Sequence, residues 1–207
     1  MPSPLEPDRY YHIYNHANGK DDLFASDGNY RFFLDKYGTH IASVADTFCY
    51  CLMPNHFHLL VCIKSEETLE SYFRSAFPKF RTLEKLPIEN LLSKQFSNLF
   101  SAYTQAFNKQ QNRKGSLFMK NFKRKPVKKE KYLIKLAHYI HYNPVEHGFC
   151  EKPEEWKYSS YNTILSDKST MVLRKEVIEW FEDLDNFIYC HSYPPVMTGI
   201  ECVFKEH

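Results

Sequence analysis

The sequence predicts an α+β fold in which helices pack on one face of an antiparallel sheet. Apolar and polar residues alternate with the period of a strand in four runs, at residues 10–17, 47–53, 56–63 and 116–124. Apolar residues recur at helical spacing in four others, at residues 29–44, 67–83, 91–108 and 128–142. If the two helical runs at 67–83 and 91–108, which Pro87 separates, count as one interrupted helical region, the chain order is β-α-β-β-α-β and then a helix. This order resembles the ferredoxin-like split βαβ plan.

Turn residues and prolines mark the boundaries of these runs. Pro54-Asn55 separates the second strand from the third by a short break, which predicts a hairpin. We expect Pro126 to end the fourth strand and Pro144 to end the last of the four helices. Proline lacks a backbone N–H, and it disfavours the helical conformation in the residue before it.

The chain divides into one domain and an extension. We expect residues 1–165 to form a single domain and residues 166–207 to form a C-terminal helical extension, with a final helix over residues 174–187. A chain of 207 residues is long enough for one hydrophobic core with a small appendage.

Positive charge is concentrated in one window of the sequence. The whole chain carries a formal charge of +2, but residues 109–131 hold ten Lys or Arg and one Glu, a local charge of +9 that leaves −7 for the rest. Such a window is typical either of a site for a polyanion or of a solvated loop. The basic residues nearest the end of the window, and our candidates for nucleic-acid contacts, are Lys120, Lys123, Arg124, Lys125, Lys128 and Lys129.

The remaining composition argues against several other classes of protein. The six cysteines form no C-x-x-C pair, so a zinc ribbon is not expected, and three of them lie in strand-like runs as small core residues. The first residues lack the basic and apolar segments of a signal peptide, and no apolar run reaches the ~18 residues of a membrane span. We therefore expect a cytoplasmic protein with no membrane partner.

His56 and His58 are the first candidate site. On a strand, side chains two residues apart point to the same face, so both imidazoles can reach one metal ion, while Phe57 and Leu59 anchor the strand on the other face. We expect both histidines on the open face of the sheet. The alternative is that an H-x-H pattern arises by chance among ordinary core or surface histidines.

Tyr139 and Asn143 are the second candidate site. They are four residues apart, so they share one face of the predicted helix. A tyrosine hydroxyl is a covalent nucleophile, and an amide oxygen can complete a metal shell. The alternative is a packed tyrosine at a helix end with Asn143 as a cap. Tyr132 and Tyr142 are competing nucleophiles on the same helix.

The order of these motifs resembles the single-tyrosine HUH transposases, and in particular the REP-associated tyrosine transposases and related insertion-sequence transposases. The segments that carry the resemblance are YHIYN at residues 11–15, MPNHFHLL at 53–60, GSLF at 115–118, YIHYNPV at 139–145 and WKYSSY at 156–161. Relatives often have an Arg at the position of His16 and a Trp at that of Phe118, so the roles of those two residues are not carried over.

The resemblance implies a role for each matching residue. His56 and His58 match the family's metal ligands, Asn143 stands where relatives place a Gln or Asn that completes the metal shell, and Tyr139 matches the nucleophile. It further implies Mg²⁺ or Mn²⁺ as the cofactor and single-stranded DNA with an adjacent hairpin as the partner. The reaction would be cleavage and rejoining through a 5′-phosphotyrosine, as in DNA transposition. A homodimer and a monomer both fit the sequence.

Two other functions remain open at this point. The first is a catalytically silent nucleic-acid-binding module, regulatory or domesticated, that keeps the fold. The second is a structural metal site or a metal hydrolase, in which water replaces tyrosine as the nucleophile. The presence of all four residues, His56, His58, Tyr139 and Asn143, favours the transposase.

Overall fold

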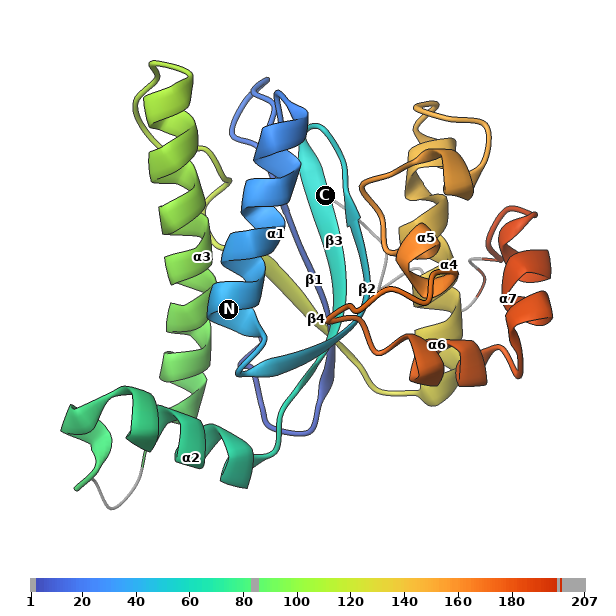
Figure 1. The fold of residues 1–207 in the computed structure, drawn as a ribbon. Coiled ribbons are helices and arrows are strands. Elements are labelled where there is room, and N and C mark those ends of the chain that lie inside the picture. Colours follow the sequence, from blue (N-terminus) through green and yellow to red (C-terminus); the bar gives the residue numbers. More distant parts are fainter. Residues whose placement is uncertain (1–2, 83–85, 197, 199–207) are drawn as a thin grey trace.

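The computed structural model describes residues 3–82, 86–196 and 198. The centre of the fold is a four-stranded antiparallel sheet with the strand order β2-β3-β1-β4, shown in Figure 1. The strands are β1 (Tyr10–His16), β2 (Ala45–Leu52), β3 (His56–Ile63) and β4 (Lys123–Val127). The α+β class and the antiparallel sheet are confirmed. Two sequence predictions, a helix end at Leu83 and a sixth cysteine at Cys202, fall outside the described residues.

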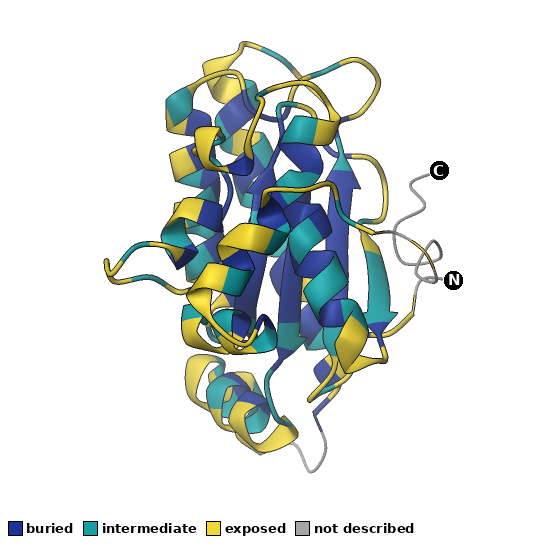
Figure 2. Cartoon of the chain, turned by 90° about the vertical axis from the view of Figure 1, so that its right-hand side faces the viewer, coloured by how far each residue is buried: buried dark blue, intermediate teal, exposed yellow. Residues whose placement is uncertain are grey.

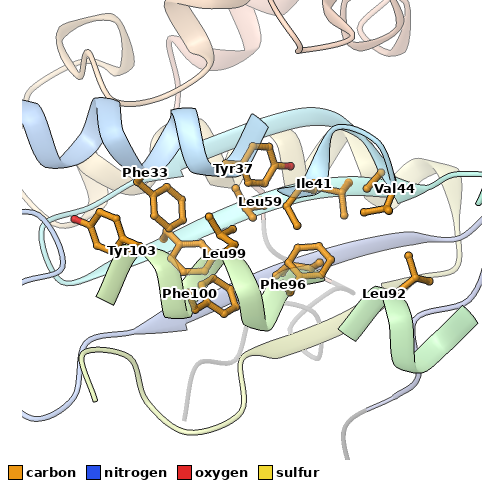
Figure 3. Close-up of a cluster of buried hydrophobic side chains, with 14 of the residues drawn as sticks. Phe33, Tyr37, Ile41, Val44, Leu59, Leu92, Phe96, Leu99, Phe100 and Tyr103 are labelled. Carbon is orange, nitrogen blue, oxygen red and sulfur yellow. The ribbon is translucent and has the colours of Figure 1, made fainter. Parts of the chain in front are cut away.

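One face of the sheet is covered by α1 (Asp27–Ile41) and α3 (Ile88–Gln110), with α2 (Glu66–Ala76) and the short η1 (Pro78–Phe80) between them in the chain. Figure 3 shows the core that α1 and α3 make with the sheet. Its aromatic centre is Phe33 of α1 against Tyr103 of α3 and Phe57 of β3, with ring centroids 5.3 and 5.4 Å apart. The predicted helices therefore pack as expected on this face.

The opposite face is covered as well, which corrects the prediction that helices lie on one face only. Here α4 (Glu130–Glu146) crosses the sheet (Figure 1), backed by η2 (Pro153–Glu155), α5 (Tyr161–Ile164), α6 (Arg174–Trp180) and α7 (Leu184–His191). Leu136 and Ile140 of α4 join Cys49, Cys51 and Leu60 in a second buried cluster. The physical reason is that β2 and β3 carry small or apolar side chains on both faces, and both faces need cover.

The outer sides of the helices on the α4 side are exposed and their inner sides buried, as Figure 2 shows. The predicted C-terminal extension packs into this layer, with Val177 of α6 and Phe187 of α7 fully buried. It contains two short helices and not the single helix predicted over residues 174–187. Glu182 has a left-handed φ of 74° between them, and Asp183 caps α7 by accepting a hydrogen bond from the backbone N–H of Asn186.

Two proline predictions were wrong. The fourth strand is β4, and Pro126 lies inside it, which is tolerated because β4 is an edge strand with a row of unpaired backbone groups. Residues 116–122 form a loop and not a strand, with one isolated bridge from Phe118 to Ala17, just after β1. Helix α4 continues through Pro144 to Glu146, so Asn143 is in helical conformation and not at a helix end.

No helix among the described residues is both long and apolar enough to cross a membrane. Of the cysteines, Cys49 and Cys51 are buried as predicted and Cys62 is half-buried, and all three are free thiols.

Candidate active site

The two histidines of β3 point to the same face of the sheet, as predicted. His56 and His58 are 2% and 0% exposed, and their ring centroids are 5.1 Å apart. Phe57 and Leu59 point the other way into the core with α1 and α3. The face that holds the histidines is covered by α4, so both rings are enclosed and not open to solvent as the sequence suggested.

The neighbouring strand β1 adds three more rings to this face. In the antiparallel register His16 lies opposite His56, and Tyr14 lies opposite His58. The rings of His16 and His56 stack with centroids 4.9 Å apart. His12 reaches His58 directly, with 2.9 Å between His12 Nε2 and His58 Nδ1. The two histidines of β3 therefore lie beside a row of three rings from β1.

Helix α4 brings the second motif onto the same cluster. The ring of Tyr139 lies edge-on to that of His58, with 5.6 Å between centroids, and is 6% exposed. Asn143, one turn further along, is fully buried with its Oδ1 3.1 Å from His56 Nε2. The structure thus brings together the four residues that the sequence singled out.

The competing tyrosines of α4 lie elsewhere. Tyr142 is half-buried and packs edge-on against His138, on the side of the helix that faces α7. Tyr132 is half-buried beside the ammonium groups of Lys129 and Lys131, near the start of the helix. Tyr139 is therefore the tyrosine of α4 that lies against the histidine pair.

The hydrogen bonds of His56 bear on whether a metal ion fits here. Its Nδ1 lies 2.8 Å from Asn55 Oδ1, an oxygen that only accepts, so Nδ1 donates. In the neutral ring, Nε2 then carries a lone pair, and this lone pair faces the amide of Asn143. Two facing acceptors repel one another unless a cation lies beside both.

The amide of Asn143 gives a second test of the fit. Its Nδ2 is buried and has no hydrogen-bond partner in the described part of the chain. A half-turn of the amide would let Nδ2 donate to His56 and would leave Oδ1 in the unpartnered position. In both orientations one buried polar atom of Asn143 lacks a protein partner, which is the condition expected of a group that serves an absent ligand.

The spacing of the two donors also fits. Adjacent ligands of one octahedral ion at ~2.1 Å are about 3.0 Å apart, and His56 Nε2 and Asn143 Oδ1 are 3.1 Å apart. Within the described residues, no group of three or more His, Cys, Asp and Glu side chains is arranged to hold a metal ion. A site built on the two imidazoles would therefore need a donor of another kind, such as the amide oxygen of Asn143.

The basic residues divide between the two faces of the sheet. In the register of β1 and β4, Lys123 lies opposite Tyr14 and Lys125 opposite His12, so both belong to the face of the histidines. The ammonium group of Lys125 lies 5.3 Å from the centre of the Tyr14 ring. Arg124 lies opposite Ile13 and points to the α3 side, where it donates a hydrogen bond to Ser93.

The other predicted basic residues are at the surface. Lys120 is exposed in the loop before β4, and Lys128 and Lys129 are exposed between β4 and α4. A cavity of about 360 Å³ opens at the end of the site nearest this loop. Its lining residues are Tyr14, Asn15, His16, Ala17, Gly19, Asn55, Met119 and Lys123.

Phe118, where relatives often have a Trp, is 5% exposed and packs against Phe57 and Phe100 in the core. It is therefore mainly a core residue here.

His12 and Tyr14 are site residues that the sequence reasoning missed. The alternation of His12, Tyr14 and His16 with apolar Tyr11 and Ile13 was a signal for them, because it gives β1 one ring-bearing face. Only the pairing of β1 with β3 shows that this face is the one that holds His56 and His58.

The chain was compared with known proteins. No family model matches it. A REP-associated tyrosine transposase from Haemophilus influenzae is 30% identical over 118 residues, which are 56% of this chain and 59% of that protein. The predicted resemblance to the REP-associated tyrosine transposases is confirmed. The match spans about three fifths of the relative's length.

A solved structure agrees on the fold. A REP-associated tyrosine transposase bound to a REP hairpin superposes with a TM-score of 0.53 at 14% sequence identity, covering 81% of this chain and 84% of that chain. At this identity the likeness concerns the fold alone. It shows that the sheet, with helices on both faces, is the scaffold found in a REP-associated tyrosine transposase.

Proposed function

We propose that this chain is a metal-dependent tyrosine transposase that cuts and rejoins single-stranded DNA next to hairpins. The observation that carries the proposal is the convergence of α4 on β3. Tyr139 lies against His58, and Asn143 lies against His56, in one buried cluster. This arrangement supports the proposal, because it puts a tyrosine hydroxyl beside side chains that can hold a metal ion, on a fold found in a REP-associated tyrosine transposase.

His56, His58 and Asn143 would hold the divalent cation, Mg²⁺ or Mn²⁺. When bound, such an ion offsets charge on the oxygens of a phosphodiester and exposes phosphorus to attack. The support is the pair of facing acceptors, His56 Nε2 and Asn143 Oδ1, together with the unpartnered amide atom of Asn143. Imidazole ligands favour Mn²⁺, and the amide oxygen suits both ions.

Tyr139 would supply the nucleophilic oxygen. Attack of its hydroxyl oxygen on the scissile phosphorus forms a phosphotyrosine bond and breaks the bond to the 3′ oxygen, which leaves as a free 3′-hydroxyl. The phenol has a reference pKa of ~10, so its proton must be taken up during attack. A 3′-hydroxyl can later attack the 5′-phosphotyrosine, which restores Tyr139 and joins the strands without another energy source.

The role of the protein around Tyr139 is to position the ring. Leu136 and Ile140, which flank Tyr139 on α4, are fully buried in the second cluster, so the helix cannot rotate without exposing them. Lys123 and Lys125 add positive charge to the same face, where the DNA backbone would lie.

The experiment is covalent capture of DNA. The purified chain is incubated with a labelled hairpin-bearing single-stranded DNA and Mn²⁺, and the products are separated on a denaturing gel. We expect a protein-linked DNA band from the wild type and from Tyr142→Phe, and none from Tyr139→Phe or in excess chelator. Both tyrosine variants should still retard the DNA on a native gel.

Other outcomes would contradict the proposal. An adduct formed by Tyr139→Phe but not by Tyr142→Phe would show that Tyr142, and not Tyr139, is the nucleophile. Binding without any adduct, across hairpins taken from the DNA beside its gene, would favour a silent nucleic-acid-binding module. Free cleaved DNA with no covalent intermediate would favour a metal hydrolase.

A further inference from the structure

A second groove lies on the face of the sheet opposite the candidate active site. It has a volume of about 670 Å³ and runs between α3 and the loop before β4. One wall is a row of hydroxyl groups at four-residue spacing on α3, from Ser93, Ser97 and Ser101. The other wall includes Phe122 and Arg124.

Arg124 is the half-buried charged group in the lining of this groove. Its Nη1 donates to Ser93 Oγ at 2.8 Å, but its Nε is buried with no hydrogen-bond partner in the described part of the chain. Of the carboxylates that the structure describes, none forms an ion pair with it. Burial lowers the pKa of the Arg124 guanidinium, because the cation is partly removed from water.

Glu89 acts on Arg124 only through its charge at a distance, and a half-buried guanidinium without an ion-paired carboxylate is costly unless a ligand supplies an anion. Arg124 also lies over the ring of Phe122, with 5.0 Å from its central carbon to the ring centre. The ring of Phe122 also packs against Phe96 and Phe100, with centroids 5.2 and 5.5 Å apart, so it supports the guanidinium from below. The plane of the guanidinium can stack on an aromatic ring, and its N–H groups can bind negative charge. A nucleotide has both features that this arrangement recognises, a phosphate and an aromatic base.

The groove is connected to the candidate active site. Asn15 and Met119 line both this groove and the smaller cavity beside His16. The loop is fixed there, because the backbone of Met119 bonds to His16 O and accepts from Asn15 Nδ2. The side chain of Met119 is 45% exposed between the two spaces. A flexible strand could pass around this point from one face to the other.

We propose that the groove between α3 and the loop before β4 binds an unpaired nucleotide of the bound DNA, with its phosphate at the N–H groups of Arg124 and its base stacked on the guanidinium that Phe122 supports. This inference rests on the proposed function, because it requires the chain to bind single-stranded DNA. It assigns Arg124 a role separate from that of Lys123 and Lys125 on the other face.

The test compares two DNA hairpins, one with an oligothymidine flank and one with a blunt end. Their affinities are measured by fluorescence anisotropy across a range of salt concentrations for the wild type and three variants. Arg124→Gln removes the charge, and Ser97→Leu narrows the groove without changing charge. Lys94→Gln is the control, since Lys94 is an exposed cation on the same helix that does not line the groove.

We expect Arg124→Gln and Ser97→Leu each to weaken binding of the flanked hairpin about tenfold, the scale of one lost base stack. Binding of the blunt hairpin should not change. Arg124→Gln should also lower the salt slope for the flanked hairpin by about 0.7, the value for one phosphate contact on a single strand. Ser97→Leu and Lys94→Gln should leave that slope unchanged.

Cross-linking locates the flank independently of affinity. With 5-iodouracil in the flank, light should join the DNA to a peptide of the loop before β4 or of α3. If Arg124→Gln does not fold, Ser97→Leu and the cross-link still decide the question.

Failure of the inference is distinguishable from failure of the proposed function. If the wild type binds the flanked hairpin and forms the covalent adduct, but Arg124→Gln and Ser97→Leu bind it with wild-type affinity, the groove is not a nucleotide site. A cross-link mapped only to other peptides overturns it as well. If the wild type binds neither hairpin, the proposed function and this inference fail together.

Discussion

Asn143 of α4 lies 3.1 Å from His56 of β3, although the two residues are 87 positions apart in the sequence. The contact exists because α4 continues through Pro144 and keeps Asn143 in helical conformation, one turn after Tyr139. The position of Tyr139, the proposed nucleophile, is thereby tied to that of Asn143, a proposed metal donor, since a shift of α4 would move both.

The first prediction concerns this amide. Asn143→Asp keeps an oxygen donor of the same size and adds charge, whereas Asn143→Leu keeps the volume and removes the donor. We expect Asn143→Leu to need about tenfold or more Mn²⁺ for half-maximal adduct formation, and Asn143→Asp to need no more than the wild type. Metal titrations of the adduct band measure this, with thermal unfolding as the check on folding. An unchanged Mn²⁺ requirement in Asn143→Leu would remove Asn143 from the donor set.

The second prediction concerns His12 as a positioning residue. Its Nε2 lies 2.9 Å from His58 Nδ1, a contact that holds the His58 ring in one orientation. We expect His12→Phe to raise the Mn²⁺ requirement about 10–100-fold while the affinity for DNA in chelator stays as in the wild type. His12→Gln, which keeps a hydrogen-bonding group, should recover part of the loss. An equal loss of DNA affinity in both variants would show that His12 acts on the fold or on DNA directly.

The sequence predicted the local parts of the site well, because each part depends on one period. Alternation on β3 is enough to place His56 and His58 on one face with Phe57 on the other, and helical spacing is enough to pair Tyr139 with Asn143. Neither period contains the register between strands. The contact of His12 with His58 therefore could not be predicted, although both residues lie in segments that the sequence analysis singled out.

The missed elements have a similar cause. The prolines predict the end of a strand and of a helix, but Pro126 lies in an edge strand, where one row of backbone groups is unpaired and proline is tolerated. Pro144 removes one hydrogen bond from α4, and the helix continues only two residues beyond it, to Glu146. The strand position decides which side of the sheet a basic residue faces. The fourth strand is β4, at residues 123–127 and not at 116–124. Its pairing with β1 puts Arg124 on the α3 side and puts Lys123 and Lys125 on the side of the histidines.

The third prediction tests this division of the basic residues. We expect Lys123→Gln with Lys125→Gln to reduce the salt slope of single-stranded DNA binding by about 0.7 for each lost phosphate contact, because both lysines face the candidate active site. The control is Lys168→Gln with Lys175→Gln, which removes the same charge from exposed positions after α5 and at α6. Salt-dependent anisotropy measures both. Equal slopes for the two double variants would place the DNA on another surface.

The last prediction concerns the stability of the layer behind α4. His191 of α7 is fully buried, with its Nε2 3.0 Å from His141 Nδ1 and its Nδ1 2.7 Å from the carbonyl oxygen of Phe187. Burial, together with the nearby His138, lowers the pKa of His191 to about 3. The unfolded chain takes up a proton at this residue near pH 6.5, and the folded chain does not.

The free energy of unfolding should therefore be highest above pH 6.5 and fall as the pH drops toward 3, by about 1.4 kcal/mol per pH unit for each histidine that stays neutral. Urea unfolding at a series of pH values measures this slope. His191→Phe removes one such histidine, so the slope of its unfolding free energy against pH should be shallower by up to about 1.4 kcal/mol per pH unit. The variant should also be less stable at neutral pH, because His141 loses a hydrogen-bond partner. The same slope in His191→Phe and in the wild type would mean that His191 takes up its proton in the folded state, and that the packing of α7 on α4 does not depend on a neutral imidazole.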